Sequence, residues 1–130
     1  MKFLRKKTEE TEPKRSRQKF RFQDDQELVL NTNNLVPVIL QDVTSREVLH
    51  LGYMDRWALN TTLEHKIVYL YRRSKGRLEK FGSKNNREYQ IKSVKLDKSR
   101  RSLLMSVSAV VNDASKPDTV SSFMRKIKIP

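Results

Sequence analysis

The 130-residue sequence contains no cysteine, only two histidines (His50 and His65) and three glycines. The lack of cysteine excludes disulfide bonds, thiolate zinc sites, iron–sulfur clusters and a cysteine nucleophile, and two histidines cannot form a three-histidine metal site. No apolar run approaches the ~18–20 residues that span a membrane, and no apolar signal-peptide segment follows the first charges. We therefore expect a cytoplasmic protein without a cofactor.

Positive charge is in excess, with 28 Lys and Arg against 15 Asp and Glu and a net charge of +13. Residues 1–23 alone hold nine basic and three acidic residues, and too few apolar side chains to offset the entropy of ordering. We predict a basic, disordered arm over residues 1–25 and one folded domain over residues 26–130. The arm is either a solubilising tail or a nucleic-acid-binding arm, because clustered cations bind phosphates. Phe20 and Phe22, between basic residues, form either a short strand or a stacking surface for bases.

The apolar pattern from Leu28 onward predicts an α+β domain with a mainly antiparallel sheet. Asp55 is a suitable N-cap for one short amphipathic helix over residues 56–65. We expect Trp57 of this helix to lie in the core, His65 to favour the helix dipole, and His50 to be a packed or edge residue of a strand. Apolar and β-branched runs predict strands at residues 35–40, 47–54, 67–71, 89–96 (with irregular alternation) and 103–111.

Motifs with a known chemistry are missing. The sequence has no glycine-rich phosphate loop, no metal-ligand spacing and no Ser/His/Asp arrangement, so we assign no catalytic residue. Residues 72–77, which contain Gly76, form a basic turn, and residues 82–86 form a second turn. Composition and motifs alone indicate a basic α+β domain.

Three sequence blocks nevertheless match a known pattern. Residues 35–42 are Leu-Val-Pro-Val-Ile-Leu-Gln-Asp, residues 47–59 are Glu-Val-Leu-His-Leu-Gly-Tyr-Met-Asp-Arg-Trp-Ala-Leu, and residues 71–78 are Tyr-Arg-Arg-Ser-Lys-Gly-Arg-Leu. Together with their spacing, these blocks resemble the phosphoribosyl-AMP cyclohydrolase family of histidine biosynthesis, over roughly residues 35–124. The resemblance implies an intertwined homodimer that opens a purine ring by hydrolysis, with zinc on three cysteines and magnesium on aspartates in a site shared by both subunits.

The metal ligands of that family are replaced here. Its Asp-Cys-Asp-x-Asp motif falls on residues 97–101, where Asp97 is the aspartate that remains. Its C-terminal Cys-His and Ser-Cys pairs fall on residues 115–116 and 121–122, where serines stand for the cysteines and lysine for the histidine. A serine hydroxyl stays protonated and is a poor zinc ligand, so we predict no metal. The replaced or degenerate positions are Asp97, Lys98, Ser99, Arg101, Ser115, Lys116 and Ser122.

Cations at these positions suit phosphate better than magnesium. They indicate either a pocket adapted to anions or a site that has drifted toward the basic surface of the whole chain. In family terms the turn 72–77 lies beside the ribonucleotide, and Gly76 lets backbone N–H groups approach an anion. The candidate phosphate- or RNA-binding residues are Arg72, Arg73, Ser74, Lys75, Arg77, Lys98, Arg100, Arg101 and Lys116.

Two functions remain. The first is a catalytically inactive cyclohydrolase-like protein, a pseudoenzyme, that binds RNA or the ribosome. The alternative is a nucleotide-binding enzyme of the same family with altered, zinc-independent chemistry. For either, the resemblance implies a homodimer, and we expect the apolar residues 103–105 and 110–111 to need cover that one small sheet does not supply.

Overall fold

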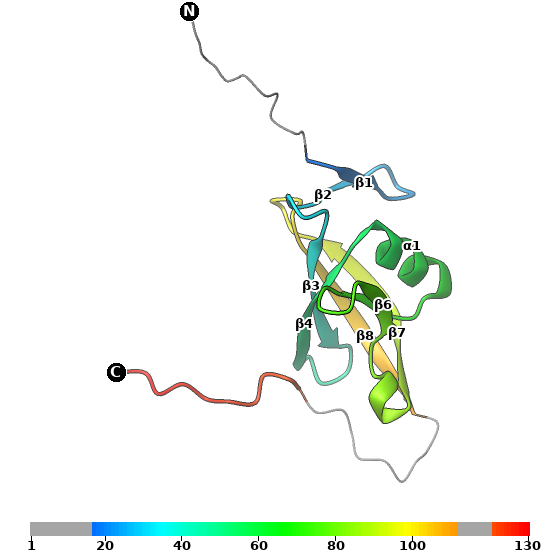
Figure 1. Cartoon of the computed structure of the whole chain (residues 1–130). Helices are drawn as coiled ribbons and strands as arrows, with labels where there is room; N and C mark the ends of the chain where they lie inside the picture. The colour runs from blue at the N-terminus through cyan, green and yellow to red at the C-terminus, as the bar shows by residue number, and fades with distance from the viewer. Residues whose placement is uncertain (1–16, 112–120) are drawn as a thin grey trace, which may run out of the picture.

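The computed structural model describes residues 17–111 and 121–130, which form a four-stranded sheet with one helix and two small hairpins (Figure 1). The elements in chain order are β1 (Lys19–Arg21), β2 (Glu27–Val29), β3 (Val36–Asp42), β4 (Val48–Met54), α1 (Arg56–His65), β5 (Tyr69–Arg72), β6 (Arg77–Lys80), the 3-10 helix η1 (Ser83–Asn85), β7 (Arg87–Leu96) and β8 (Leu103–Val111). The sheet order is β4-β3-β8-β7; β3 and β8 are parallel and the other neighbours are antiparallel. The predicted α+β class with a mainly antiparallel sheet is confirmed.

The hairpin of β3 and β4 forms where the apolar runs predict it. Val36, Val38 and Leu40 of β3 are fully buried, because side chains of a strand alternate between its two faces. Val38 pairs with Gly52 of β4. A Cβ on Gly52 would lie 2.7 Å from Cδ1 of Leu70. Glycine therefore lets β5 pack directly on β4, which positions the following turn.

The helix α1 begins and ends as the sequence predicts. Oδ1 of Asp55 accepts a hydrogen bond from the backbone N–H of Ala58 at 2.8 Å, as an N-cap should. The helix buries Ala58, Leu59 and Thr62, but Trp57 is 60% exposed, so its predicted place in the core is wrong. Trp57 lies about 100° around the helix from Ala58, on the side away from Leu59. No helix in the described ranges is long and apolar enough to cross a membrane.

A β-bulge in β7 explains the irregular alternation of apolar residues in its sequence. Its register against β8 pairs Ile91 with Val107 and Ser93 with Ser106, with a shift between Ile91 and Ser93. This bulge inserts one residue, Lys92, and moves the following residues onto the other phase of the strand. Val94 therefore packs against the core in spite of its spacing from Ile91.

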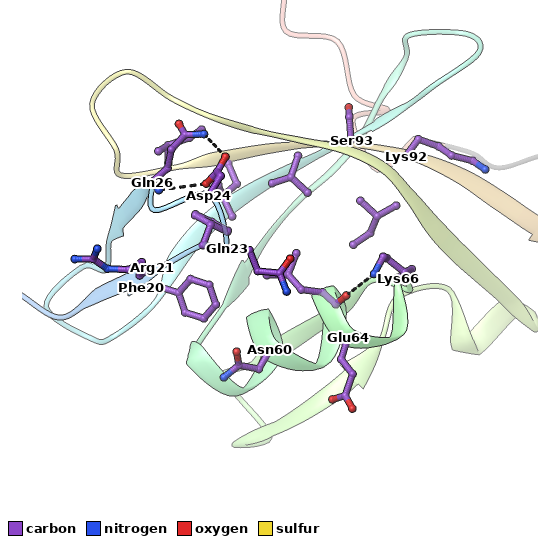
Figure 2. Close-up of a pocket in the computed structure, with 16 residues that line it drawn as sticks. Phe20, Arg21, Gln23, Asp24, Gln26, Asn60, Glu64, Lys66, Lys92 and Ser93 are labelled. Carbon is purple, nitrogen blue, oxygen red and sulfur yellow. Dashed lines mark hydrogen bonds between the residues drawn. The ribbon is translucent and has the colours of Figure 1, made fainter.

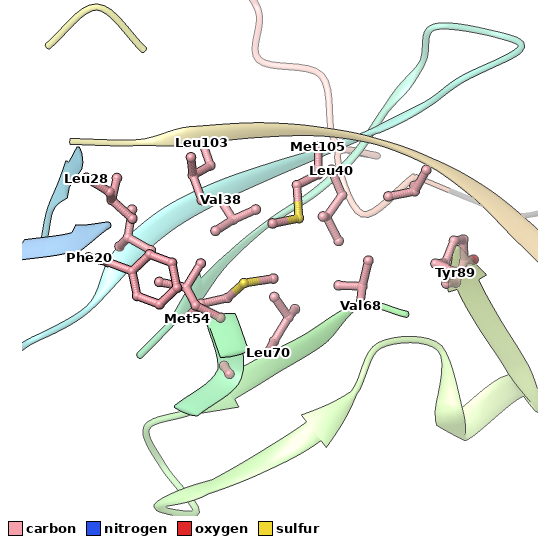
Figure 3. Close-up of a cluster of buried hydrophobic side chains, with 14 of the residues drawn as sticks. Phe20, Leu28, Val38, Leu40, Met54, Val68, Leu70, Tyr89, Leu103 and Met105 are labelled. Carbon is pink, nitrogen blue, oxygen red and sulfur yellow. The ribbon is translucent and has the colours of Figure 1, made fainter. Parts of the chain in front are cut away.

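The core includes residues that the sequence placed in the basic arm. Phe20 of β1 is buried beside Leu28 of β2, and both belong to the same cluster as Val38 and Met105 (Figure 3). The strand interpretation of the Phe20 segment is confirmed, since Phe20 pairs with Leu28 in the β1–β2 register. The predicted boundary at residue 25 is wrong, because one buried aromatic ring is enough to join this segment to the core. The first 16 residues of the predicted arm lie outside the described residues.

Candidate functional site

The structure brings His50 and Ser122 together from segments that are 72 residues apart. His50 lies on β4, and the C-terminal segment runs beside this strand. The hydroxyl of Ser121 donates to the carbonyl of Val48 at 2.6 Å, and the backbone N–H of Ser122 donates to the carbonyl of Leu49 at 2.8 Å. These contacts place Oγ of Ser122 at 3.0 Å from Nδ1 of His50. Ser122, a predicted site position, therefore contacts His50, which the sequence analysis expected to be only a packed or edge residue of a strand.

Aromatic packing fixes the ring of His50. The ring stacks on Phe81, with centroids 5.2 Å apart and planes at 22°, and Phe81 in turn contacts Tyr89 at 4.8 Å. Burial and the nearby Arg72 guanidinium both lower the pKa of His50 below its ordinary value. The imidazole is therefore neutral at neutral pH and keeps one nitrogen that can accept a proton.

The turn between β5 and β6 carries the first predicted set of cations. Nη1 of Arg72 lies 2.7 Å from Oε1 of Glu79, and Nζ of Lys75 lies 3.6 Å from its Oε2. Burial alone would raise the pKa of Glu79, but Arg72 and Lys75 lower it, so this carboxylate stays ionised. Arg72 is half-buried, whereas the residues from Arg73 to Arg77 are exposed. One acid thus balances part of the charge and holds the Arg72 side chain, which also lowers the pKa of His50.

Two backbone N–H groups of this turn form hydrogen bonds within the turn. The N–H of Lys75 donates to the carbonyl of Arg72 at 3.0 Å, and the N–H of Gly76 donates to the carbonyl of Arg73 at 3.3 Å. Gly76 has a φ of +59°, which suits glycine. These two N–H groups are therefore engaged within the turn, and the approach of other backbone N–H groups of the turn to an anion stays a prediction. The exposed side chains of the turn are further candidates for a phosphate contact.

The second predicted set, on the loop 97–101, lies elsewhere in the fold. Its residues are exposed, and the carboxylate of Asp97 accepts a hydrogen bond from the N–H of Ser99 at 3.0 Å. Hydrogen bonds from Ser99 lower the pKa of Asp97. The carbonyl of Arg100 accepts from the N–H of Val29 at 2.7 Å, so this loop adjoins the β1–β2 hairpin. The structure does not join this set, which includes Lys98 and Arg101, to the turn of β5 and β6.

The donor groups do not fit the zinc ion that the resemblance implies. The chain has no cysteine, and in residues 17–111 and 121–130 no three His, Asp or Glu side chains are grouped as metal ligands. Asp97 is the remaining carboxylate of its motif. Ser115 and Lys116 lie outside the described residues. We therefore derive no chemistry from a bound metal.

A cavity of about 830 Å³ lies between the β1–β2 hairpin, α1 and β7 (Figure 2). None of the predicted site residues lines it. The alternation of Phe20 and Phe22 with basic residues was the sequence feature that could have pointed to this cavity, since both residues line its wall. The cavity is lined by Phe20, Arg21, Phe22, Gln23, Asp24, Gln26, Asn60, Leu63, Glu64, Lys66, Ile91, Lys92, Ser93, Val94, Leu96 and Leu103.

Comparison with known proteins gives relatives of one kind, although no family model matches the chain. The chain is 40% identical over 76 residues to "Phosphoribosyl-AMP cyclohydrolase" of Clostridium botulinum, a match that covers 58% of this chain and 70% of the relative. It is 44% identical over 78 residues to "Histidine biosynthesis bifunctional protein HisIE" of Photobacterium profundum, covering 60% of this chain and 38% of the relative. The protein of the same name from Pyrococcus furiosus is 40% identical over 98 residues, and the match covers 75% of this chain and 46% of the relative. The chain thus spans less than half of these bifunctional relatives.

Proposed function

This chain belongs to the phosphoribosyl-AMP cyclohydrolase family, and we propose that it binds an adenosine ribonucleotide of the phosphoribosyl-AMP type and acts on it without zinc. The observation that carries this proposal is the contact of His50 Nδ1 with Ser122 Oγ at 3.0 Å, close to Arg72. Ser122 stands where the family has a cysteine. The chain therefore offers a proton-accepting group, His50, next to a position where its family has a metal ligand.

His50 is the proposed general base. When Nδ1–H donates to the Ser122 hydroxyl, Nε2 keeps its lone pair; this tautomer is our assignment. Nε2 takes a proton from a water molecule whose oxygen bonds to a carbon of the purine ring. This proton then passes to the ring nitrogen that is released when the carbon–nitrogen bond opens, and the remaining hydroxyl proton moves to the other nitrogen on that carbon as the carbonyl forms. A lowered pKa keeps His50 neutral, as a general base must be.

Phosphate contacts come from the exposed side chains of the β5–β6 turn. Arg73 offers a planar fork for two phosphate oxygens, and Lys75 offers a point charge. Arg72 is already engaged with Glu79 at 2.7 Å, so its role is to shape the site and to keep His50 neutral.

The direct test is calorimetry with AMP on chelator-treated protein, with metal analysis of the same sample and an assay of phosphoribosyl-AMP hydrolysis. We expect saturable one-to-one binding, no stoichiometric zinc, and turnover that a chelator does not change. Absence of binding at millimolar AMP would overturn the nucleotide site. One tightly held zinc per chain would overturn the zinc-independent chemistry.

The contact between Ser122 and His50 has a matched test. Ser122→Ala removes the hydroxyl but keeps the backbone N–H that bonds to Leu49. The loss of one hydrogen bond should reduce turnover by up to about tenfold. Ser99→Ala, on the exposed loop 97–101, is the control and should leave turnover unchanged.

A second candidate function is RNA or ribosome binding by an inactive protein. The net charge of +13 favours it, as do the exposed cations Lys98, Arg100 and Arg101. Binding to RNA should fall steeply with salt, in proportion to the number of phosphates contacted. Nuclease treatment of the protein purified from cells, followed by analysis of what is released, separates this function from a nucleotide site.

We also propose that the chain is a homodimer, as the family resemblance implies. The two predicted halves of the site, at residues 97–101 and at Ser122, lie apart within one chain. Repulsion between two chains of charge +13 opposes association at low salt, so the dimer needs apolar cover.

A further inference from the structure

The strand β7 forms one edge of the four-stranded sheet, because the strand order is β4-β3-β8-β7. The first half of this edge is covered, since the N–H of Ile91 donates to the carbonyl of Lys66 at 2.9 Å. Over residues 92–96, no backbone hydrogen bond within the described ranges joins β7 to any element other than β8. We call this part of β7 the open edge.

The hydrogen bonds of β7 show which backbone groups face outward at the open edge. The N–H of Asp97 donates to the carbonyl of Ser102 at 3.0 Å, so Asp97 directs its N–H toward β8. In an antiparallel pair, alternate residues bond to the partner strand, and the residues between them face the other way. The register against β8 is regular from Val94 to Leu96. The N–H and C=O groups of Val94 and Leu96 therefore point away from β8, in the direction of a further strand.

The side chains of these two residues are also incompletely covered, unlike those of the neighbouring strand β8. Leu103 and Met105 of β8 are buried in the chain's own core, so the expected need for cover at residues 103–105 is wrong for these two residues. Val94 and Leu96 are half-buried and line the cavity of about 830 Å³ beside α1. This volume lies within the usual range of ligand sites, about 300–1,000 Å³. The open edge thus borders a cavity with room for a ligand.

Three lysines beside the open edge, Lys66, Lys92 and Lys95, are all exposed. Within the described ranges, none of them forms an ion pair with a carboxylate. Nζ of Lys66 instead contacts the carbonyl of Leu63, a neutral acceptor, at 3.2 Å. Exposed lysines on an edge strand repel basic segments, including those of this chain of net charge +13. They attract an acidic segment.

The two acids in the cavity wall do not pair with these lysines. Asp24 lies on the β1–β2 hairpin, where its carboxylate accepts hydrogen bonds from the side chain of Gln26 at 2.7 Å and from the backbone N–H of Gln26 at 3.2 Å. Figure 2 shows the carboxylate of Glu64 on the side of α1 that faces away from β7. The charge on the open edge itself is therefore positive.

We propose that the open edge of β7 binds an extended acidic peptide segment of a partner protein, which adds a strand to the sheet. Backbone hydrogen bonds to Val94 and Leu96 hold the peptide about 4.8 Å from β7. Alternate side chains of the peptide fall on opposite faces, so one set packs in the cavity and the other lies beside Lys95. The recognised segment therefore alternates apolar and acidic residues. This inference uses no residue of the nucleotide site and does not depend on the homodimer.

A synthetic peptide tests this surface on the full chain. The probe is a fluorescent six-residue peptide in which Val and Glu alternate, with both ends blocked, and its binding is measured by anisotropy. We expect saturable one-to-one binding. Replacing each Val by Ser should weaken binding by at least about tenfold, because the apolar burial is lost, and replacing each Glu by Lys should abolish it. Equal binding of the three peptides, or no saturable binding up to millimolar peptide, would overturn the proposal.

A substitution at Val94 tests the backbone bonds. Val94→Pro removes an outward N–H without removing a bond to β8, and proline is tolerated at such positions of edge strands. Val94→Ala is the matched control, since it shortens the side chain but keeps the N–H. We expect Val94→Pro to bind the Val–Glu peptide about three- to tenfold more weakly than Val94→Ala, as one hydrogen bond is lost. Equal affinity of the two variants would overturn the proposal.

Ester-containing peptides test the same bonds without changing the protein. In one peptide, ester oxygens replace the N–H groups along one edge, and in a second peptide they replace those along the other edge. Only one edge of an added strand faces β7, so one ester peptide should bind more weakly than the other. Equal affinity of the two would overturn the proposal, even if the Val94→Pro chain does not fold.

Light scattering separates a peptide from a second copy as the occupant of the open edge. The homodimer should have a mass of about 31 kDa, twice the 15.4 kDa of one copy. Val94→Pro and saturating peptide should both leave the mass of the protein assembly unchanged, which supports the peptide as occupant. Dissociation by either would show that a second copy occupies the edge and would overturn the proposal. A mass of one chain in every sample would contradict the homodimer alone, and loss of AMP binding alone would bear only on the nucleotide site.

Discussion

The turn 72–77 and the loop 97–101 carry similar runs of cations, but the structure gives them different neighbours. The first packs through Leu70 on Gly52 and places Arg72 beside Glu79 and His50. The second is exposed and bonds mainly to itself through Asp97. Charge in a sequence therefore does not by itself identify a site. What distinguishes the first turn is a half-buried histidine with a perturbed pKa and a fixed partner.

The largest effect should come from His50→Gln, which keeps a polar side chain but removes the base. Turnover of phosphoribosyl-AMP should fall by about 10²–10⁴-fold, the usual contribution of a general base. AMP affinity should change little. The matched control is His65→Gln at the exposed end of α1, which should behave like the parent in steady-state kinetics. Equal activity of both variants would remove His50 from the mechanism.

Gly52→Val tests whether the packing of β5 on β4 builds the first turn. The new Cβ would meet Leu70 at 2.7 Å, and overpacking of this kind costs about 1–3 kcal/mol of unfolding free energy. AMP affinity should fall with it, since Arg72 is the last residue of β5. Ser99→Val, in the exposed loop, should stay within about 0.5 kcal/mol. Urea denaturation measures both, and an unaffected Gly52→Val chain would contradict the packing argument.

Paired double variants compare the two basic sets directly. Arg73→Ala with Lys75→Ala should weaken AMP binding by about three- to tenfold, as two exposed charge contacts are lost. Lys98→Ala with Arg101→Ala should leave AMP affinity unchanged. For single-stranded RNA, each pair should lower the salt slope by about 1.4 if both sets contact phosphates. An effect of the second pair on AMP would mean that a partner subunit joins the two sets.

The smallest effect is a pH dependence that arises from His50. Its pKa is lowered in the folded chain, while the unfolded chain has the ordinary value of ~6.5. On acidification the unfolded state binds the proton first, so the free energy of unfolding falls as the pH drops below ~6.5. Urea midpoints measured down to pH ~5 should show this decrease, and His50→Gln should reduce it. A slope that is the same in both chains would assign the effect to other groups.

Local patterns predicted the helix and the four strands of the main sheet, but not the short strands β2 and β6. The carboxylate of Asp55 starts α1 as expected, because an N-cap acts within one turn. The apolar run at residues 35–40 predicted the strand β3. The burial of two aromatic residues was not predicted. Trp57, expected in the core, is exposed, and Phe20, placed in the basic arm, is buried. A large aromatic ring has no preference that fixes its partner, so its burial depends on which neighbouring element covers it.

The candidate site was only partly predictable. The position of Ser122 and the cations of the turn 72–77 followed from the family resemblance, and Arg72 and Ser122 do lie beside one residue, His50. His50 itself gave no signal, since a lone histidine in a strand pattern is usually a packed residue. Its role depends on burial, on Phe81 and on a segment 72 residues away.

The sequence by itself determined the class of the fold, the family and the absence of any thiolate metal site. These properties depend on local periodicity, on motif spacing and on residue types, which need no knowledge of what lies across the fold. Only the tertiary structure decided which cations sit beside a titratable group and which apolar side chains remain uncovered. The pKa of His50 and the half-burial of Val94 and Leu96 are set by neighbours distant in the chain, and those neighbours exist only once the sheet has formed.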